Sequence, residues 1–226
     1  AAEARTGGAR VVILEKMPSF GGNSVIAGGG YCCWDSRLRL RQRLGLGDDS
    51  PELHMADTMK SGGYLNDPAL VEVLVREAPA GLDWLLDAGA VFRETVNRIG
   101  GHSAYRSHHA ACNLAKVLKD HALSLGAELR VNTAVTALCR DGAGGPVRGV
   151  RAASGGTEKT IAARRGVVIA SGGFGADAQM RSEVSPVLSA AVGCTNHRGA
   201  TGELLRYARE IGAQAIQLEH IQLFPC

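Results

Sequence analysis

The chain has 226 residues, enough for one large domain or two small ones with a real hydrophobic core. Its apolar content of 45% and charged content of 21% are ordinary for a globular protein, and a net charge of +3 is too small to indicate a nucleic-acid partner. No apolar run approaches the roughly 18 residues that a membrane-spanning helix requires, so we expect no membrane span.

The most informative segment is an apolar strand followed by a glycine-rich loop. Residues 11–14 are apolar and mostly β-branched, as in a buried parallel strand. Glu15 follows directly, at the position where the acidic residue of a dinucleotide fold accepts hydrogen bonds from a ribose. In residues 21–30 the glycines let backbone N–H groups approach a flat or anionic ligand. Together these features predict a bound adenine dinucleotide.

Helices are predicted next along the chain. Ser50-Pro51 and Asp67-Pro68 each combine an N-cap residue with a proline at the first helical position. A further helix is expected at residues 113–125, ended by Gly126, and Gly89 is a candidate C-cap for the helix before it. After Asp67, the apolar residues Leu70, Val71, Leu74 and Val75 are expected to share one buried helical face, and Leu82, Leu85 and Leu86 form a similar stripe.

The periodicity then changes to that of short strands. Candidates at residues 128–131, 135–139, 147–152 and 159–162 are separated by turn residues and predict a small antiparallel meander. Residues 167–170 predict a return to a buried parallel strand, and residues 202–211 predict a final helix.

These motifs, in this order, resemble the FAD domain of the soluble fumarate reductases, which include the flavocytochrome c type and urocanate reductase, within the succinate dehydrogenase flavoprotein superfamily. The further matches are Ser50-Pro51-Glu52-Leu53, residues 66–71, Asp83-Trp84, residues 168–174 and Gly202-Glu203-Leu204. The resemblance implies an α/β fold, a partial Rossmann-like FAD-binding domain with parallel strands and a small inserted antiparallel β-meander. The family's first strand with its G-x-G-x-x-G turn, and its C-terminal capping domain, have no counterpart in this sequence. We therefore expect residues 1–226 to be one incomplete FAD-binding domain, truncated at both ends.

The resemblance also implies the residues that hold FAD. They are Glu15, Lys16, Gly22, Asn23, Ser24, Gly28, Gly29, Val135, Ser171, Gly172, Gly173 and Glu203. Asn23 stands where the membrane succinate dehydrogenases carry a histidine bonded covalently to the flavin, so FAD is expected to be non-covalent here. Val135 would contact adenine through its backbone, and Glu203 replaces the aspartate that is usual in relatives.

Two residues are expected near the substrate, Gly29 and Phe224. Phe224 replaces the histidine that binds a substrate carboxylate in fumarate reductases, and phenylalanine neither donates a hydrogen bond nor carries charge. The catalytic arginine of the family matches nothing in the sequence, so we assign no catalytic residue.

The implied activity is that of an FAD-dependent oxidoreductase, which transfers a hydride between flavin N5 and an activated carbon–carbon bond. An unsaturated small-molecule carboxylate such as fumarate or urocanate is the expected substrate, with a separate electron donor of unspecified kind. Phe224 favours an alternative, a ketosteroid or other enone dehydrogenase of the same superfamily. The other alternative is a folded remnant without activity, and we expect no turnover from these residues alone.

Three groups of reactive or charged residues receive simpler interpretations. The arginines of residues 37–43 are expected to form a solvated face rather than a patch for acidic partners. His102, Arg106, His108 and His109 have neither metal-ligand spacing nor a carboxylate nearby in sequence, so a polar loop near the flavin is favoured over a catalytic cluster. The six cysteines also lack metal-ligand spacing, so we expect no metal and a reducing, cytoplasmic compartment.

Overall fold

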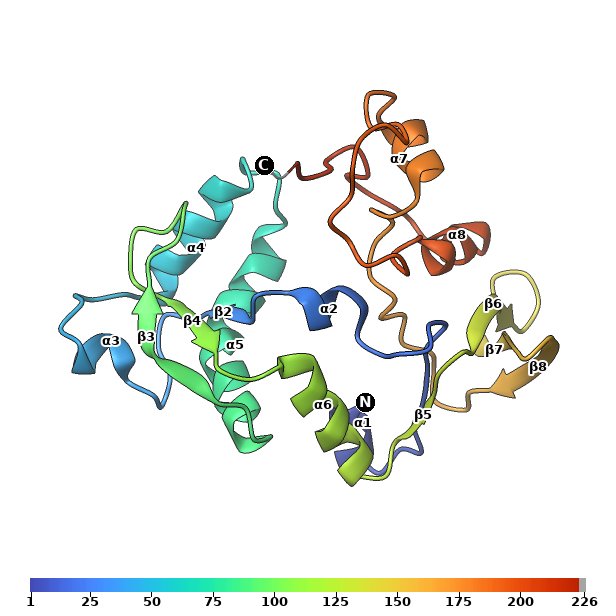
Figure 1. Ribbon diagram of the computed structural model, residues 1–226, viewed down its shortest axis with the longest axis horizontal. Coiled ribbons are helices and arrows are strands. Elements are labelled where there is room, and N and C mark those ends of the chain that lie inside the picture. The colour runs from blue at the N-terminus through green and yellow to red at the C-terminus, as the bar shows by residue number, and fades with distance from the viewer. Residues whose placement is uncertain (224–226) are drawn as a thin grey trace. The chain divides into compact units, whose positions relative to one another are not determined.

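The structure is a computed structural model that describes residues 1–223 (Figure 1). The chain forms two compact units: residues 1–26 together with the chain from residue 122 onward, and residues 27–121. None of the helices described is long and apolar enough to cross a bilayer.

The first unit contains a parallel strand pair. Strand β1 (Val12–Leu14) pairs with β5 (Glu128–Arg130), with Ile13 opposite Leu129. The strand predicted at residues 11–14 is therefore confirmed. The strand predicted at residues 128–131 exists, but it belongs to this parallel pair and not to the antiparallel meander. It directly follows a helix, and parallel strands are typically joined through helical connections.

The meander is formed by the three remaining strand candidates. Strands β6 (Ala134–Arg140), β7 (Val147–Ser154) and β8 (Thr157–Ala162) pair antiparallel in that order. Gly155 and Gly156, at φ of 56° and 77°, make the two-residue turn between β7 and β8. Two adjacent residues with positive φ match the turn that suits the twist of a hairpin.

Residues 167–170, which we expected to be a buried parallel strand, are irregular and largely exposed. Val168 is 90% exposed and Ile169 is 43% exposed. A run of apolar residues becomes a buried strand only where neighbouring strands bond its N–H and C=O groups. Within the described residues the parallel pairing is between β1 and β5, and neither strand is bonded to this segment.

Short helices complete the first unit: α1 (Ala2–Thr6), α2 (Gly22–Ile26), α7 (Ala178–Val184) and α8 (Glu203–Glu210). Helix α2 lies in what we expected to be a loop at residues 21–30, and α8 confirms the final helix. Asp177 caps α7 by accepting a hydrogen bond from the Met180 N–H at 2.9 Å, and its other oxygen accepts one from Arg206 of α8 at 2.9 Å. One carboxylate therefore joins α7 to α8.

The second unit is built on an antiparallel sheet that the sequence analysis did not predict. Its order is β2 (Gly30–Cys32), β4 (Ser107–Ala110), β3 (Phe92–Asn97). The strands are short and more than half of their residues are polar, so they lack the apolar alternation by which strands are recognised. The helices of this unit are α3 (Leu40–Arg43), α4 (Pro51–Ser61), α5 (Pro68–Asp87) and most of α6 (Leu114–Ser124).

Both predicted helix starts in this unit are confirmed. The Ser50 hydroxyl accepts a hydrogen bond from the Leu53 N–H at 3.1 Å at the start of α4. The Asp67 carboxylate accepts one from the Ala69 N–H at 2.9 Å at the start of α5. Each cap satisfies an N–H group that has no partner within its helix.

Helix α5 buries a narrower stripe than we expected. Its buried residues are Val71, Val75, Ala78, Leu82 and Leu85. Leu70 and Leu74 are 69% and 55% exposed, so their expected place in the core is wrong. Each precedes a buried valine by one residue, and one residue turns the helix by about 100°, which is enough to leave a narrow stripe.

A proline lies inside α5, and a tryptophan compensates for it. Pro79 has no N–H, so the carbonyl of Val75, four residues earlier, loses its helical donor. The indole Nε1–H of Trp34 donates to that carbonyl at 3.0 Å. The backbone polar group that the proline leaves unbonded is therefore satisfied from another part of the chain.

We predict that Trp34→Phe lowers the free energy of unfolding by about 1–3 kcal/mol, because the Val75 carbonyl is left buried without a donor. Urea unfolding of the purified chain measures the change. Trp84→Phe is the matched control, since the Trp84 ring stacks edge-on against His121 and no hydrogen bond of its indole is seen in the described part of the chain. Equal losses in the two variants would contradict the prediction.

Candidate functional site

Glu15 is fixed at the carboxyl end of β1 by its backbone and its side chain. Its N–H donates to the Arg130 carbonyl at 2.9 Å, and its own carbonyl accepts from the Thr133 N–H at 2.9 Å. Its Oε1 accepts a hydrogen bond from the Met17 N–H at 2.8 Å. Its Oε2 has no hydrogen-bond partner among residues 1–223. The half-buried Glu15 thus has one carboxylate oxygen left to accept a ligand's hydroxyl.

Lys16 does not project freely beside it, because Glu203 and Thr201 hold its ammonium group. Its Nζ donates to both Glu203 oxygens at 2.7 and 2.8 Å and to the Thr201 hydroxyl at 2.5 Å. The Thr201 hydroxyl in turn donates to Glu203 Oε1 at 2.6 Å. Burial raises the pKa of Glu203, but the bonds from Lys16 and Thr201 outweigh burial and hold that pKa below its usual value. Both oxygens of the Glu203 carboxylate are therefore engaged by Lys16, and one of them also by Thr201.

Gly202 makes this arrangement possible. It precedes α8 at φ 69°, a conformation that side chains other than glycine rarely adopt. A Cβ at this position would lie 2.6 Å from the Cβ of Phe174 and 3.1 Å from the sulfur of Met180. The backbone before Glu203 is thus packed against its neighbours so closely that only glycine fits.

Asn23 lies in α2, and both polar atoms of its side chain bond to a loop far along the chain. Its Oδ1 accepts from the His197 N–H at 2.6 Å, and its Nδ2 donates to Asn196 Oδ1 at 2.6 Å. Ser24 is exposed in the same short helix, and Gly22, at φ 47°, begins it.

Gly28 and Gly29 belong to the second unit, whereas the other expected cofactor residues belong to the first. Gly29 has φ 70°, its carbonyl accepts from the Ala110 N–H at 2.9 Å, and a Cβ there would lie 3.2 Å from the Ala110 Cβ. Gly28 faces open space. Gly29 is therefore needed for strand packing, whether or not it also contacts a ligand.

The segment Ser171-Gly172-Gly173 is exposed and irregular. Gly172 has φ 75°, and neither it nor Gly173 has an atom within 4 Å of an added Cβ. Its backbone is thus open to a ligand. Phe224, the expected substrate residue, lies outside the described residues.

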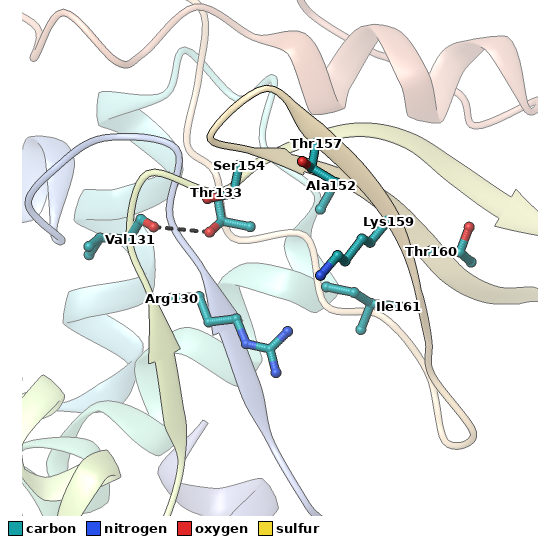
Figure 2. A pocket seen from close by; sticks show the side chains of 9 residues that line it. All are labelled: Arg130, Val131, Thr133, Ala152, Ser154, Thr157, Lys159, Thr160 and Ile161. Carbon is teal, nitrogen blue, oxygen red and sulfur yellow. Dashed lines mark hydrogen bonds between the residues drawn. The ribbon is translucent and has the colours of Figure 1, made fainter.

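A pocket of about 640 Å³ lies between the end of β5 and the meander (Figure 2). It is lined by Arg130, Val131, Thr133, Ala152, Ser154, Thr157, Lys159, Thr160 and Ile161. Arg130 and Lys159 extend toward the same opening, but Arg130 is already paired with Glu128 at 2.7 Å. The expected cofactor residue Val135 is the strand partner of Ala152 and is not itself part of the lining.

Glu15 and the expected glycines have the chemical groups that an adenine dinucleotide needs. Glu15 offers an acceptor at the end of a parallel strand, where such folds hold a ribose. In the same unit, Gly22, Gly172 and Gly173 have nothing within 4 Å of an added Cβ, so a ligand can approach the backbone there.

The second unit contains a buried cluster of charges that the sequence analysis missed. The fully buried Arg106 guanidinium makes a two-point pair with Asp49 at 2.7 and 2.9 Å and a single bond to Asp57 at 2.7 Å. Arg41 is also buried, donating to the carbonyls of Trp34 at 2.5 Å and Gly47 at 2.9 Å. Arg41 is therefore an exception to the expected solvated arginine face, whereas Arg37, Arg39 and Arg43 are exposed as expected. Arg106 has no carboxylate nearby in sequence, and its partners come from distant positions. Asp49 and Asp57 lie more than forty residues earlier in the sequence, and no local pattern relates them to Arg106.

The histidines around this cluster are held neutral. Burial and then the Arg106 charge lower the pKa of His54 to about 4, and the same two causes lower the pKa of His102. For His108, burial and then Arg41 lower the pKa. Unfolding lets His54 take up a proton between about pH 4 and its ordinary pKa of 6.5, so acidification through this window destabilises the fold. Neutral histidines around an arginine that is already paired with two carboxylates indicate a structural cluster.

An α/β fold with a carboxylate at the end of a parallel strand is typical of a dinucleotide-binding domain, and solved structures agree. The open conformation of a flavocytochrome c3 fumarate reductase matches with a TM-score of 0.86 and 29% identity, over 93% of this chain and 37% of that chain. The 3-ketosteroid-Δ4-(5α)-dehydrogenase of Rhodococcus jostii RHA1 matches with a TM-score of 0.84 and 25% identity, over 94% and 51%.

Three curated relatives match almost the whole chain. They are the acrylate reductase flavoprotein subunit of Shewanella woodyi (34% identity, 98% of this chain, 45% of the relative), the fumarate reductase (cytochrome) of Shewanella frigidimarina (32%, 100%, 39%) and the urocanate reductase of Eggerthella lenta (30%, 96%, 36%). The chain spans less than half the length of each. Residues 1–226 match the FAD binding domain family, and the chain belongs to this family of flavin-dependent oxidoreductases, in its fumarate reductase branch. FAD is the cofactor of this family.

For the buried cluster, we predict that Arg106→Met lowers the free energy of unfolding by about 3–5 kcal/mol, because Asp49 keeps a buried charge without its main partner. Arg43→Met is the control: Arg43 also pairs at 2.7 Å, with Glu94, but the two side chains are 56% and 69% exposed. That loss should be about 1 kcal/mol or less. Urea unfolding at neutral pH measures both changes, and a small loss in Arg106→Met would show that water reaches the cluster.

Proposed function

We propose that this chain is the FAD-binding part of an oxidoreductase that reduces or forms a carbon–carbon double bond conjugated to a carboxylate. FAD, when bound, supplies hydride transfer to or from that bond. Fumarate, acrylate and urocanate represent the substrate class, in keeping with the names of the three relatives. We further propose that both units belong to one FAD-binding domain, and a cytoplasmic location stays a prediction.

The observation that carries the proposal is the anchored carboxylate of Glu15. The Met17 N–H fixes Oε1 and leaves Oε2 to accept a hydrogen bond from a ribose hydroxyl. Lys16, Thr201 and Glu203 form a closed set of bonds beside it, which positions the start of α8.

The remaining expected residues would act through backbone and amide groups. Gly22, Gly28, Gly29, Ser24 and the segment 171–173 would present N–H groups or open backbone, and Val135 would present the backbone of β6. Asn23 has an amide where a histidine forms a covalent link in related enzymes. Because an amide nitrogen is a poor nucleophile, we propose that FAD is bound without a covalent bond.

A second candidate is a dehydrogenase of ketosteroids or other enones. Its support is the structural similarity to the ketosteroid dehydrogenase, together with the phenylalanine at position 224. A folded remnant that binds no flavin is the third candidate, and cofactor binding separates it from the other two.

We predict that the chain binds FAD and that Glu15→Gln weakens binding by about 1.5–3 kcal/mol, the range for a hydrogen bond to a charged group. Titration of flavin fluorescence at constant salt measures the dissociation constants. Glu128→Gln is the control, since Glu128 is an exposed carboxylate in the partner strand β5. Acid precipitation of the FAD-loaded chain should leave the flavin in the supernatant, because we expect no covalent bond. No binding by the wild-type chain would favour the remnant, and equal affinities in wild type and Glu15→Gln would remove Glu15 from the site.

We predict that the intact protein oxidises reduced viologen with an unsaturated carboxylate as acceptor and not with an enone. The assay offers fumarate, acrylate, urocanate and a 3-ketosteroid at equal concentrations, and the initial rates of viologen oxidation show which class is the acceptor. Turnover with the ketosteroid alone would replace the first proposal with the second.

A further inference from the structure

We propose that the side chains of Asn23, Asn196 and Cys194 form a hydrogen-bonded brace that positions the flavin-facing segments of the first unit. Asn196 and Cys194 are then positioning residues for FAD, although neither is among the expected cofactor contacts. The inference rests on the proposed function, because it concerns a cofactor that lies along α2 and residues 171–173.

The first half of the brace is a two-point contact at Asn23. Its Oδ1 accepts from the main-chain N–H of His197, and its Nδ2 donates to Asn196 Oδ1, both at 2.6 Å. Two bonds on one planar amide fix its orientation as well as its position. Each atom still has hydrogen-bonding capacity for another partner, because the NH₂ group has a second hydrogen and the carbonyl a second lone pair.

The second half of the brace runs through the Cys194 thiol to Gly175, which closely follows the proposed flavin-facing residues 171–173. The main-chain N–H and the Nδ2 of Asn196 both lie 3.4 Å from Cys194 Sγ, to which they donate. The thiol donates to the carbonyl of Gly175 at 2.8 Å. Gly175 lies so close that a Cβ there would be 2.4 Å from Asn196 Nδ2, so the turn packs directly against the brace.

Polar contacts hold this part of the chain because apolar packing does not. Residues 190–196 are exposed and form neither helix nor strand. Ala176 and Ala200, joined by a main-chain hydrogen bond at 2.9 Å, close the loop behind it. The chain then continues to Thr201 and Glu203, which hold Lys16. The brace therefore sets the position of a stretch that leads on to α8.

This arrangement gives Asn23 a role distinct from that of a flavin contact. If Asn23 served FAD only by direct contact, Asn196 could be removed without effect. If Asn23 acts through the brace, removing Asn196 also weakens FAD binding, and removing both costs no more than removing Asn23 alone.

The first test needs no cofactor. Amide hydrogen exchange of the peptide that spans residues 193–198 is measured in the wild-type chain and in Asn23→Ala, Asn196→Ala and Gln179→Ala. Gln179 is the control because it is an exposed amide of the same unit that bonds to Glu183 of its own helix. We expect exchange to be about two- to tenfold faster in Asn196→Ala, at least as fast in Asn23→Ala, which also removes the acceptor of the His197 N–H, and unchanged in the control.

The second test measures FAD affinity by fluorescence in the same variants, in the double variant Asn23→Ala/Asn196→Ala and in Asn196→Asp. We expect each single alanine variant to bind about two- to tenfold more weakly, with no further loss in the double variant. Asn196→Asp keeps the acceptor for Asn23 and the main-chain donor to Cys194 and loses only the Nδ2 donor, so it should bind FAD more tightly than Asn196→Ala.

Each outcome decides one of the two proposals. Unchanged exchange in Asn196→Ala would overturn the brace, and so would faster exchange with unchanged FAD affinity or additive losses in the double variant. Failure of the wild-type chain to bind FAD would count against the proposed function, and the exchange result would still decide whether the brace exists.

Discussion

The site depends on the parallel pairing of β1 with β5, a contact only three residues long. Main-chain hydrogen bonds continue beyond the pair on both sides of Glu15, to Arg130 and from Thr133. A side chain on a free loop would lose conformational entropy when it binds a ligand, whereas Glu15 has already lost most of it on folding. The strand pair thus fixes the carboxylate that we propose as the ribose acceptor.

The second unit obtains its order from a different source. Its sheet is short, and its apolar core, built around Leu82 and Phe92, is accompanied by a fully buried arginine. Asp49 precedes α4 and Asp57 lies within it, whereas Arg106 immediately precedes β4. The ion pairs therefore tie the helical part of this unit to its sheet with a geometry that apolar contacts do not define. Removing one partner is costly because the remaining charge stays buried.

Features that depend on adjacent residues could be predicted from the sequence, whereas contacts between residues far apart in the chain could not. The helix starts at Ser50 and Asp67 were predicted because capping depends on a few adjacent residues. The exposure of residues 167–170 was not predicted, since apolar composition alone does not supply strand partners. Of the expected cofactor residues, Glu15, Lys16 and Glu203 could be proposed from the sequence and its family resemblance. The bonds from Asn23 to Asn196 and His197 join positions more than 170 residues apart, and only the folded chain reveals them.

The proline within α5 links two positions that no local rule connects. While residue 79 is proline, the Val75 carbonyl needs a donor from outside the helix, and Trp34 provides it. An alanine at position 79 would restore the helical N–H and remove the need for an indole at position 34. The order of substitution during divergence therefore matters: a chain that changes Pro79 first can then replace Trp34 with little loss, whereas one that changes Trp34 first passes through a destabilised intermediate.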